Sequence, residues 1–80
     1  MMAAFVLVGI SVSGGWTDVR TLHDNLHSIT GVKTVHFLAG PTDAIVYIEV
    51  MDQMEMMRTV GEMRAVSGVI STDTRIVLPM

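Results

Sequence analysis

The chain alternates short apolar runs with segments whose apolar residues recur at helical spacing. The first run covers residues 3–12 (AAFVLVGISV), is rich in Val and Ile, and ends at a Ser-Gly-Gly sequence. A short β-branched run bounded by glycines predicts a buried strand. Later runs of the same character predict further strands over residues 32–39, 43–51 and 69–78, the last ended by Pro79.

The segment between the first two predicted strands has the pattern of an amphipathic helix. Its apolar residues recur every three or four positions, as one buried stripe on a helix requires. They are Trp16, Val19, Leu22, Leu26 and Ile29. We expect Thr17 or Asp18 to satisfy the free N–H groups at the start of this helix, and Gly31 to act as its C-cap.

A second helix is predicted after the third strand. Asp52 is followed three residues later by Glu55, a capping-box arrangement, and the helix is expected to run through about Ser67, with Gly68 closing it. The predicted buried stripe of this helix consists of Met56, Val60, Met63 and Val66.

The predicted order is β-α-β-β-α-β, and it contains an internal repeat. HSITGVKTV (27–35) and RAVSGVIST (64–72) both run from a helix end through Gly-Val into a strand. These halves predict one domain over residues 1–80 with a ferredoxin-like α+β sandwich fold. Right-handed crossovers would place both helices on one face of a four-stranded antiparallel sheet.

Both faces of the predicted sheet are apolar. In the first strand Ala4, Val6, Val8 and Ile10 oppose Phe5 and Leu7; in the second Val35 and Phe37 oppose Val32 and Leu38; in the third Ala44, Val46, Ile48 and Val50 oppose Ile45 and Tyr47. Because a sheet face in contact with water should be polar, we expect another subunit to bury the face without helices. We therefore predict a homodimer packed sheet to sheet, a dimeric α/β barrel, or a larger closed ring. The alternative is a monomer with an exposed apolar face.

Composition and charge narrow the functional classes. Half of the residues are hydrophobic, 16% are charged, and the formal net charge is −3. The basic residues are scattered, whereas a nucleic-acid interface needs them clustered, so we predict no direct binding of nucleic acid. The absence of cysteine fits a reducing, cytoplasmic setting. The apolar start lacks the basic region of a signal peptide, and no segment has the length of a membrane span.

The histidines and methionines are weak candidates for a metal site. His23 and His27 lie four residues apart on the first predicted helix and could meet one ion, but no third ligand is near, so a solvated helix flank is the simpler interpretation. His36 is interpreted as a structural, interface or pH-sensitive residue. The methionines between residues 51 and 63 fit core or interface packing better than copper binding. We predict no metal and no cofactor.

The sequence shows no catalytic motif. It contains Ser, His and Asp but no nucleophile-elbow glycine pattern, no phosphate-binding loop and no paired carboxylates at a helix start. We therefore predict a protein that is not an enzyme. The alternative is a small dimeric α/β-barrel enzyme of the cofactor-free monooxygenase or isomerase type. It would need a pocket between sheet and helices lined by His or Tyr with a shifted pKa.

The turn between the second and third predicted strands breaks two strongly apolar runs. Gly40-Pro41-Thr42-Asp43 suits a β-turn with Pro at its second position. The simplest interpretation is a hairpin loop in which Asp43 bonds the turn backbone.

Three segments carry a resemblance to a known family: AAFVLVGI, SITGVKTVHFLAGPTDAIVYIEV and VSGVISTDTRIVL. In this order, over essentially the full chain, the sequence resembles the regulatory ligand-binding (RAM) domain of the Lrp/AsnC, or feast/famine, transcription regulators. The resemblance implies the same β-α-β-β-α-β fold, dimers formed through the sheets, and octameric rings of dimers. It also implies that a small effector, typically an amino acid, binds between neighbouring dimers.

The resemblance also implies which residues bind the effector. The family's Gly-Asp-aromatic-Asp loop corresponds to Gly40 through Asp43, and a carboxylate at Asp43 would suit an effector's ammonium group. Pro41 and Thr42 depart from the family pattern at the two middle positions. Thr72 and Thr74 match a Thr-x-Thr stretch that faces the cleft in some relatives, where their hydroxyls could hold a carboxylate; ordinary β-propensity is the alternative.

The family usually carries an N-terminal helix-turn-helix domain, whereas this chain begins at the first regulatory strand. It is therefore expected to act as a stand-alone form, through ligand capture or through mixed assembly with full-length Lrp/AsnC regulators.

Overall fold

The computed structural model describes residues 1–78 and contains the predicted elements in the predicted order. They are β1 (Met2–Ile10), α1 (Trp16–His27), β2 (Val32–Phe37), β3 (Ala44–Val50), α2 (Gln53–Arg64) and β4 (Val69–Ile76). Pro79, which is predicted to end the last strand, lies outside the described residues.

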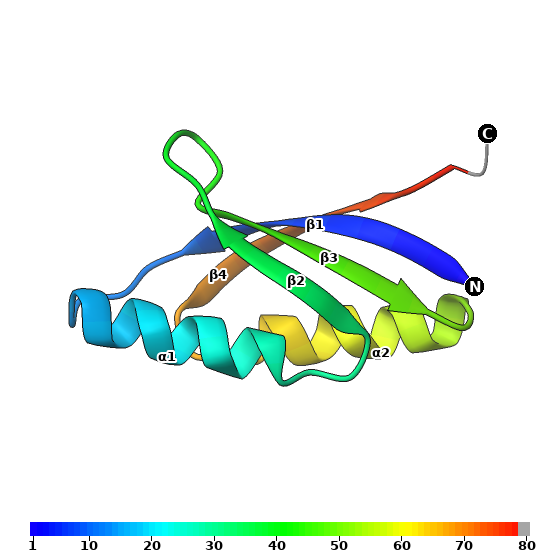
Figure 1. Ribbon diagram of the computed structural model, residues 1–80, viewed down its shortest axis with the longest axis horizontal. Coiled ribbons are helices and arrows are strands. Elements are labelled where there is room, and N and C mark those ends of the chain that lie inside the picture. Colours follow the sequence, from blue (N-terminus) through cyan, green and yellow to red (C-terminus); the bar gives the residue numbers. More distant parts are fainter. Residues whose placement is uncertain (79–80) are drawn as a thin grey trace.

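The strands form one antiparallel sheet in the order β2-β3-β1-β4. Both helices lie against the same face of this sheet, as Figure 1 shows. This is the predicted ferredoxin-like α+β sandwich, with β1 and β3 at its centre. The predictions of fold class and helix placement are confirmed.

The core lies between the central strands and the helices. The strand residues that face the helices are fully or almost fully buried: Ala4, Val6, Val8, Ala44, Val46, Ile48 and Val50. They pack with Leu22 and Leu26 of α1 and with Met56 and Met63 of α2. Burying a Val, Leu, Ile or Met side chain stabilises the fold by roughly 1.5–3 kcal/mol, so this face supplies most of the apolar driving force.

The predicted stripe of α1 is correct in its middle and wrong at its start. Leu22 and Leu26 are buried, but Trp16 is 75% exposed. Trp16 is the first residue of α1, and the first turn of the helix extends past the end of the sheet (Figure 1), so no strand covers it.

The ends of α1 also differ from the prediction. No side chain caps the first turn, where Gly15 occupies the N-cap position. Asp18 instead accepts a hydrogen bond from the Gly14 amide at 2.6 Å. The C-cap is Ser28 rather than Gly31, which follows in the loop with φ of 99°.

The capping box of α2 is confirmed in its main feature. The Asp52 carboxylate accepts a hydrogen bond from the Glu55 amide, with an Oδ1–N distance of 2.9 Å. The helix ends at Arg64 with Ala65 as its C-cap, earlier than predicted, so Gly68 lies beyond the helix end. One polar side chain joins the apolar stripe: Thr59 is fully buried and donates its hydroxyl to the Thr30 carbonyl at 3.2 Å.

The prediction for the faces of β2 is wrong at Val32. Val32 and Val35 are both buried, although they were expected on opposite faces. The register of β2 with β3 shifts between Val32 and Thr34, so Lys33 is an extra residue on β2. Such a β-bulge changes which face the preceding residue occupies.

The sheet face without helices, here called the open face, is apolar in the middle and polar at both edges. Directly paired residues of antiparallel strands share a face, and the pairing assigns Phe5, Leu7, Ile45 and Tyr47 of the central strands to the open face. The same pairing adds Thr34 and His36 at the β2 edge and Ser71, Asp73 and Arg75 at the β4 edge. Phe5 stays 42% exposed, and its ring centroid lies 5.0 Å from that of Tyr47.

The cap of α2 gives a direct test of the local structure. Asp52→Ala removes the acceptor of the Glu55 amide, so we expect the free energy of unfolding to fall by about 1 kcal/mol. Urea denaturation followed by circular dichroism measures this change. Glu62→Ala, which removes an exposed carboxylate elsewhere on α2, is the control and should cost less than about 0.5 kcal/mol. Equal losses in both variants would argue against the cap.

Candidate functional site

The register of β1 brings three loops to one end of the sheet. Val8 pairs with Ala44, so the β2–β3 loop lies beside the end of β1. Ile10 pairs with Val69, so the start of β4 lies there too. The predicted loop residues and the β1–α1 connection therefore share this end, which is visible in Figure 1.

Asp43 joins the β2–β3 loop to β1. Its carboxylate accepts a hydrogen bond from the Ile10 amide, with an Oδ2–N distance of 2.8 Å, and its carbonyl accepts one from the Leu38 amide at 2.8 Å. The carboxylate thus accepts a hydrogen bond from an amide of a neighbouring strand. The simple loop interpretation expects a bond to an amide within the turn. A carboxylate has two acceptor oxygens, so this half-buried side chain is held in place while one oxygen is left for another donor.

The other loop residues differ in their surroundings. Gly40 has φ of 139°, a value that favours glycine, and its α-carbon faces open space. Thr42 lines a hollow of about 140 Å³ on the open face. The further lining residues of this hollow are Leu7, Val8, Gly9, Pro41, Ser71 and Asp73.

The structure separates Thr72 and Thr74 from this hollow. They pair with Val8 and Val6, whose side chains face the helices, so both hydroxyls lie on the helix side of β4. Ser71 and Asp73, which the sequence reasoning missed, occupy the hollow beside Thr42 instead. The alternation along β4 is visible in the sequence, but only the pairing with β1 shows which set faces which side.

Gly9 brings Ser71 close to β1. A Cβ at Gly9 would collide with the Ser71 hydroxyl, so the absence of a side chain there allows the contact.

Asp73 forms a two-point ion pair with Arg75, with Nε–Oδ1 and Nη2–Oδ2 distances of 3.0 and 2.8 Å. The hydrogen bonds from the guanidinium hold the pKa of Asp73 below its usual value.

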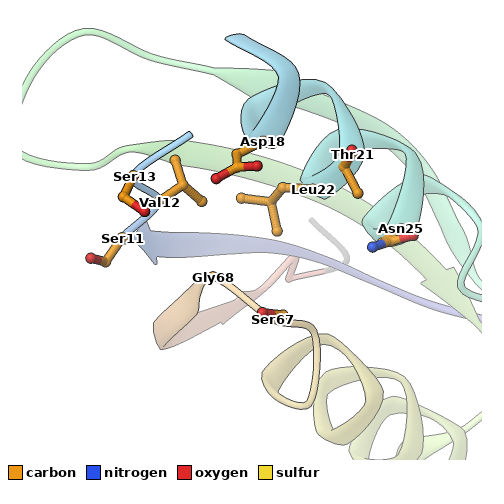
Figure 2. A pocket seen from close by; sticks show the side chains of 9 residues that line it. All are labelled: Ser11, Val12, Ser13, Asp18, Thr21, Leu22, Asn25, Ser67 and Gly68. Atoms are coloured by element: carbon orange, nitrogen blue, oxygen red, sulfur yellow. The ribbon is translucent and has the colours of Figure 1, made fainter. Parts of the chain in front are cut away.

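A larger groove of about 340 Å³ opens on the helix side at the same end of the molecule, as Figure 2 shows. It is lined by Ser11, Val12, Ser13, Asp18, Thr21, Leu22, Asn25, Ser67 and Gly68. The Ser11 amide donates to the Gly68 carbonyl at 2.8 Å and holds two of its walls together.

The enzyme alternative requires a pocket between sheet and helices that is lined by His or Tyr with a shifted pKa. Among residues 1–78, the lining of the large groove includes neither His nor Tyr, although a separate hollow of about 280 Å³ beside α1 is lined by His23 and Phe37. Tyr47 does have a raised pKa, because its hydroxyl donates to Glu49 at 2.9 Å, but it lies on the open face and not between sheet and helices.

The histidines of α1 lie close to each other without a set of metal ligands. The rings of His23 and His27 are nearly parallel, with centroids 5.8 Å apart, and His23 Nδ1 lies 3.3 Å from Asp24 Oδ1. Among residues 1–78, no three His, Asp or Glu side chains are grouped so that they could hold a metal ion. His36 is exposed on the open face.

Solved structures share the fold at low sequence identity. TTHA0845 from Thermus thermophilus superposes with a TM-score of 0.83 and 22% identity, over 100% of this chain and 96% of that one. FFRP-DM1 gives 0.80 and 24% identity, over 98% and 100% of the two chains. MtbAldR gives 0.82 and 19% identity, over 99% of this chain but 54% of that longer one.

No curated protein sequence matches the chain. In the part of the chain that the structure describes, no helix is long and apolar enough to cross a membrane.

The family model of the Lrp/AsnC ligand binding domain matches residues 4–79, nearly the whole sequence. The chain therefore belongs to the Lrp/AsnC ligand-binding domain family, the family that its sequence resembles.

Proposed function

We propose that this protein is an effector-binding domain that senses a small metabolite, an amino acid, and modulates transcription through full-length Lrp/AsnC regulators. The family match supports the regulatory class. The single structural observation that carries the proposal is Asp43, whose carboxylate is fixed by the Ile10 amide and keeps one oxygen for an ammonium group.

The proposed effector site includes the loop residues Gly40, Thr42 and Asp43 and the β4 residues Thr72 and Thr74. The loop and β4 meet at the same end of the sheet. Thr72 and Thr74 lie on the other side of β4 from the hollow that Thr42 lines. To contact both groups, an effector has to extend around the edge strand β4, or a neighbouring subunit has to complete the site. A site that a neighbouring subunit completes would satisfy this requirement.

The open face supports the proposed homodimer. An apolar centre within a polar rim is the usual anatomy of a protein interface. Here Phe5, Leu7, Ile45 and Tyr47 form the centre, flanked by the polar residues of β2 and β4. We propose that two sheets pack across this face and that the dimers assemble further into octameric rings.

Effector binding can be tested by thermal shift with each of the twenty amino acids. A ligand that binds the folded state raises the melting temperature. We expect one or more amino acids to raise the melting temperature of the wild type. Asp43→Asn keeps an acceptor for the Ile10 amide but removes the charge, so it should fold normally and lose at least about tenfold in affinity.

The control for this experiment is Asp24→Asn, which removes the same charge from the exposed surface of α1. It should leave the affinity within about twofold of the wild type, since exposed ion pairs contribute little. The amino-acid proposal is abandoned if no amino acid changes the melting temperature of the wild type.

The assembly can be tested by light scattering coupled to size-exclusion chromatography. Phe5→Lys places a charge in the apolar centre of the open face, so we expect it to shift the protein toward the monomer at micromolar concentration. Trp16→Lys, which changes a more exposed aromatic residue on α1, should leave the assembly unchanged. A wild-type monomer at this concentration would contradict the proposed interface.

A further inference from the structure

Small residues from two loops form part of the wall of the groove shown in Figure 2. The β1–α1 loop contributes Ser11 and Ser13, and the α2–β4 loop contributes Ser67 and Gly68. Gly68 has φ of 100°, and a Cβ there would lie 3.0 Å from Val12, so a larger residue would be strained and crowded. The small residues at these positions therefore leave the groove open.

One face of α1 forms the opposite wall. Asp18, Thr21, Leu22 and Asn25 line the groove at spacings of three, one and three residues, which places them on one side of a helix. Figure 2 shows Asp18 and Asn25 toward opposite ends, with Leu22 between them. The apolar part of the lining consists of Val12, which is 36% exposed, and of Leu22, which is almost fully buried behind it. The polar groups therefore surround a small apolar surface.

The charge of the lining selects the class of ligand. Within residues 1–78, Asp18 is the only charged residue that lines the groove, and none of the lining residues is Lys, Arg or His. Its carboxylate is held by the Gly14 amide at 2.6 Å through Oδ2, which leaves Oδ1 to accept from a ligand. An ammonium group can pair with this fixed carboxylate, whereas a ligand carboxylate would find no cation and would be repelled.

The remaining polar groups are suited to hydroxyls. Ser11, Ser13, Thr21 and Ser67 can each donate and accept a hydrogen bond, and the Asn25 amide can do both. A volume of about 340 Å³ lies at the lower end of the range for ligand pockets, which fits a small molecule.

We propose that this groove is a second ligand site, distinct from the effector site at the β2–β3 loop, and that it binds small organic ammonium compounds that carry hydroxyl groups and no carboxylate. Asp18 receives the ammonium group, and the serine hydroxyls of the two loops bind the hydroxyl groups. The apolar part of the ligand contacts Val12 and the exposed edge of Leu22.

The site can be tested by recording ¹H–¹⁵N spectra of the intact protein during titration with ethanolamine at neutral pH. We expect saturable shifts in the amides of Ser11, Ser13, Thr21, Ser67 and Gly68. Sodium chloride at the same ionic strength and glycine, which adds a carboxylate, should give no saturable shift at these positions. The proposal is overturned if ethanolamine gives no saturable shifts there or if glycine binds equally well.

Two variants keep the test specific. Asp18→Asn retains an acceptor for the Gly14 amide, so we expect it to fold normally and to weaken ethanolamine binding at least about tenfold. Ser67→Leu fills the groove without changing the charge and should abolish the shifts. Asp24→Asn removes one charge from the same helix outside the groove and should have less than about a twofold effect. An equal loss in Asp18→Asn and Asp24→Asn would reduce the effect to net charge and overturn the site.

Discussion

The pairing of β1 with both of its neighbours is the constraint on which the rest of this structure depends. β1 lies between β3 and β4, and its register places the β2–β3 loop and the start of β4 beside its last residues. Two successive backbone amides then connect these segments: the Ile10 amide bonds the Asp43 carboxylate, and the Ser11 amide bonds the Gly68 carbonyl. The end of β1 thus links the effector loop to the helix-side groove.

The sheet also divides the apolar residues into two sets with different uses. The set that faces the helices is buried and forms the core together with Leu22, Leu26, Met56 and Met63 of the helices. The set on the open face is only partly covered within one chain, with Phe5 42% exposed and Tyr47 half-buried. Exposed apolar patches of this kind mark interfaces in soluble proteins. Part of the hydrophobic surplus in the composition thus lies where a second subunit would pack, while other exposed apolar side chains, such as Trp16 and Met54, lie on the helices.

The two candidate sites share one structural feature, a carboxylate fixed by the backbone. In each, a carboxylate is held by a single backbone amide: Asp43 by Ile10 and Asp18 by Gly14. A side chain fixed in this way loses little further freedom when it pairs with a ligand, and it still has an acceptor available. The sites differ in their neighbours, because Asp43 lies at the edge of a proposed subunit interface while Asp18 lies in a groove formed within one chain.

The order of elements, the α2 cap at Asp52 and most of the core could be predicted from the sequence, because they follow from local spacing and local hydrogen bonds. The family was indicated by the resemblance of three segments along the chain, and the family match bears it out. The folded chain was needed to show which side of β4 carries Ser71 and Asp73, and that a bulge after Val32 moves this residue to the other face. It also decided that Trp16 lies outside the core and that Asp43 bonds a distant strand. A period of two gives two alternating sets of side chains but cannot assign them to faces, since that assignment depends on hydrogen bonds between strands far apart in the chain.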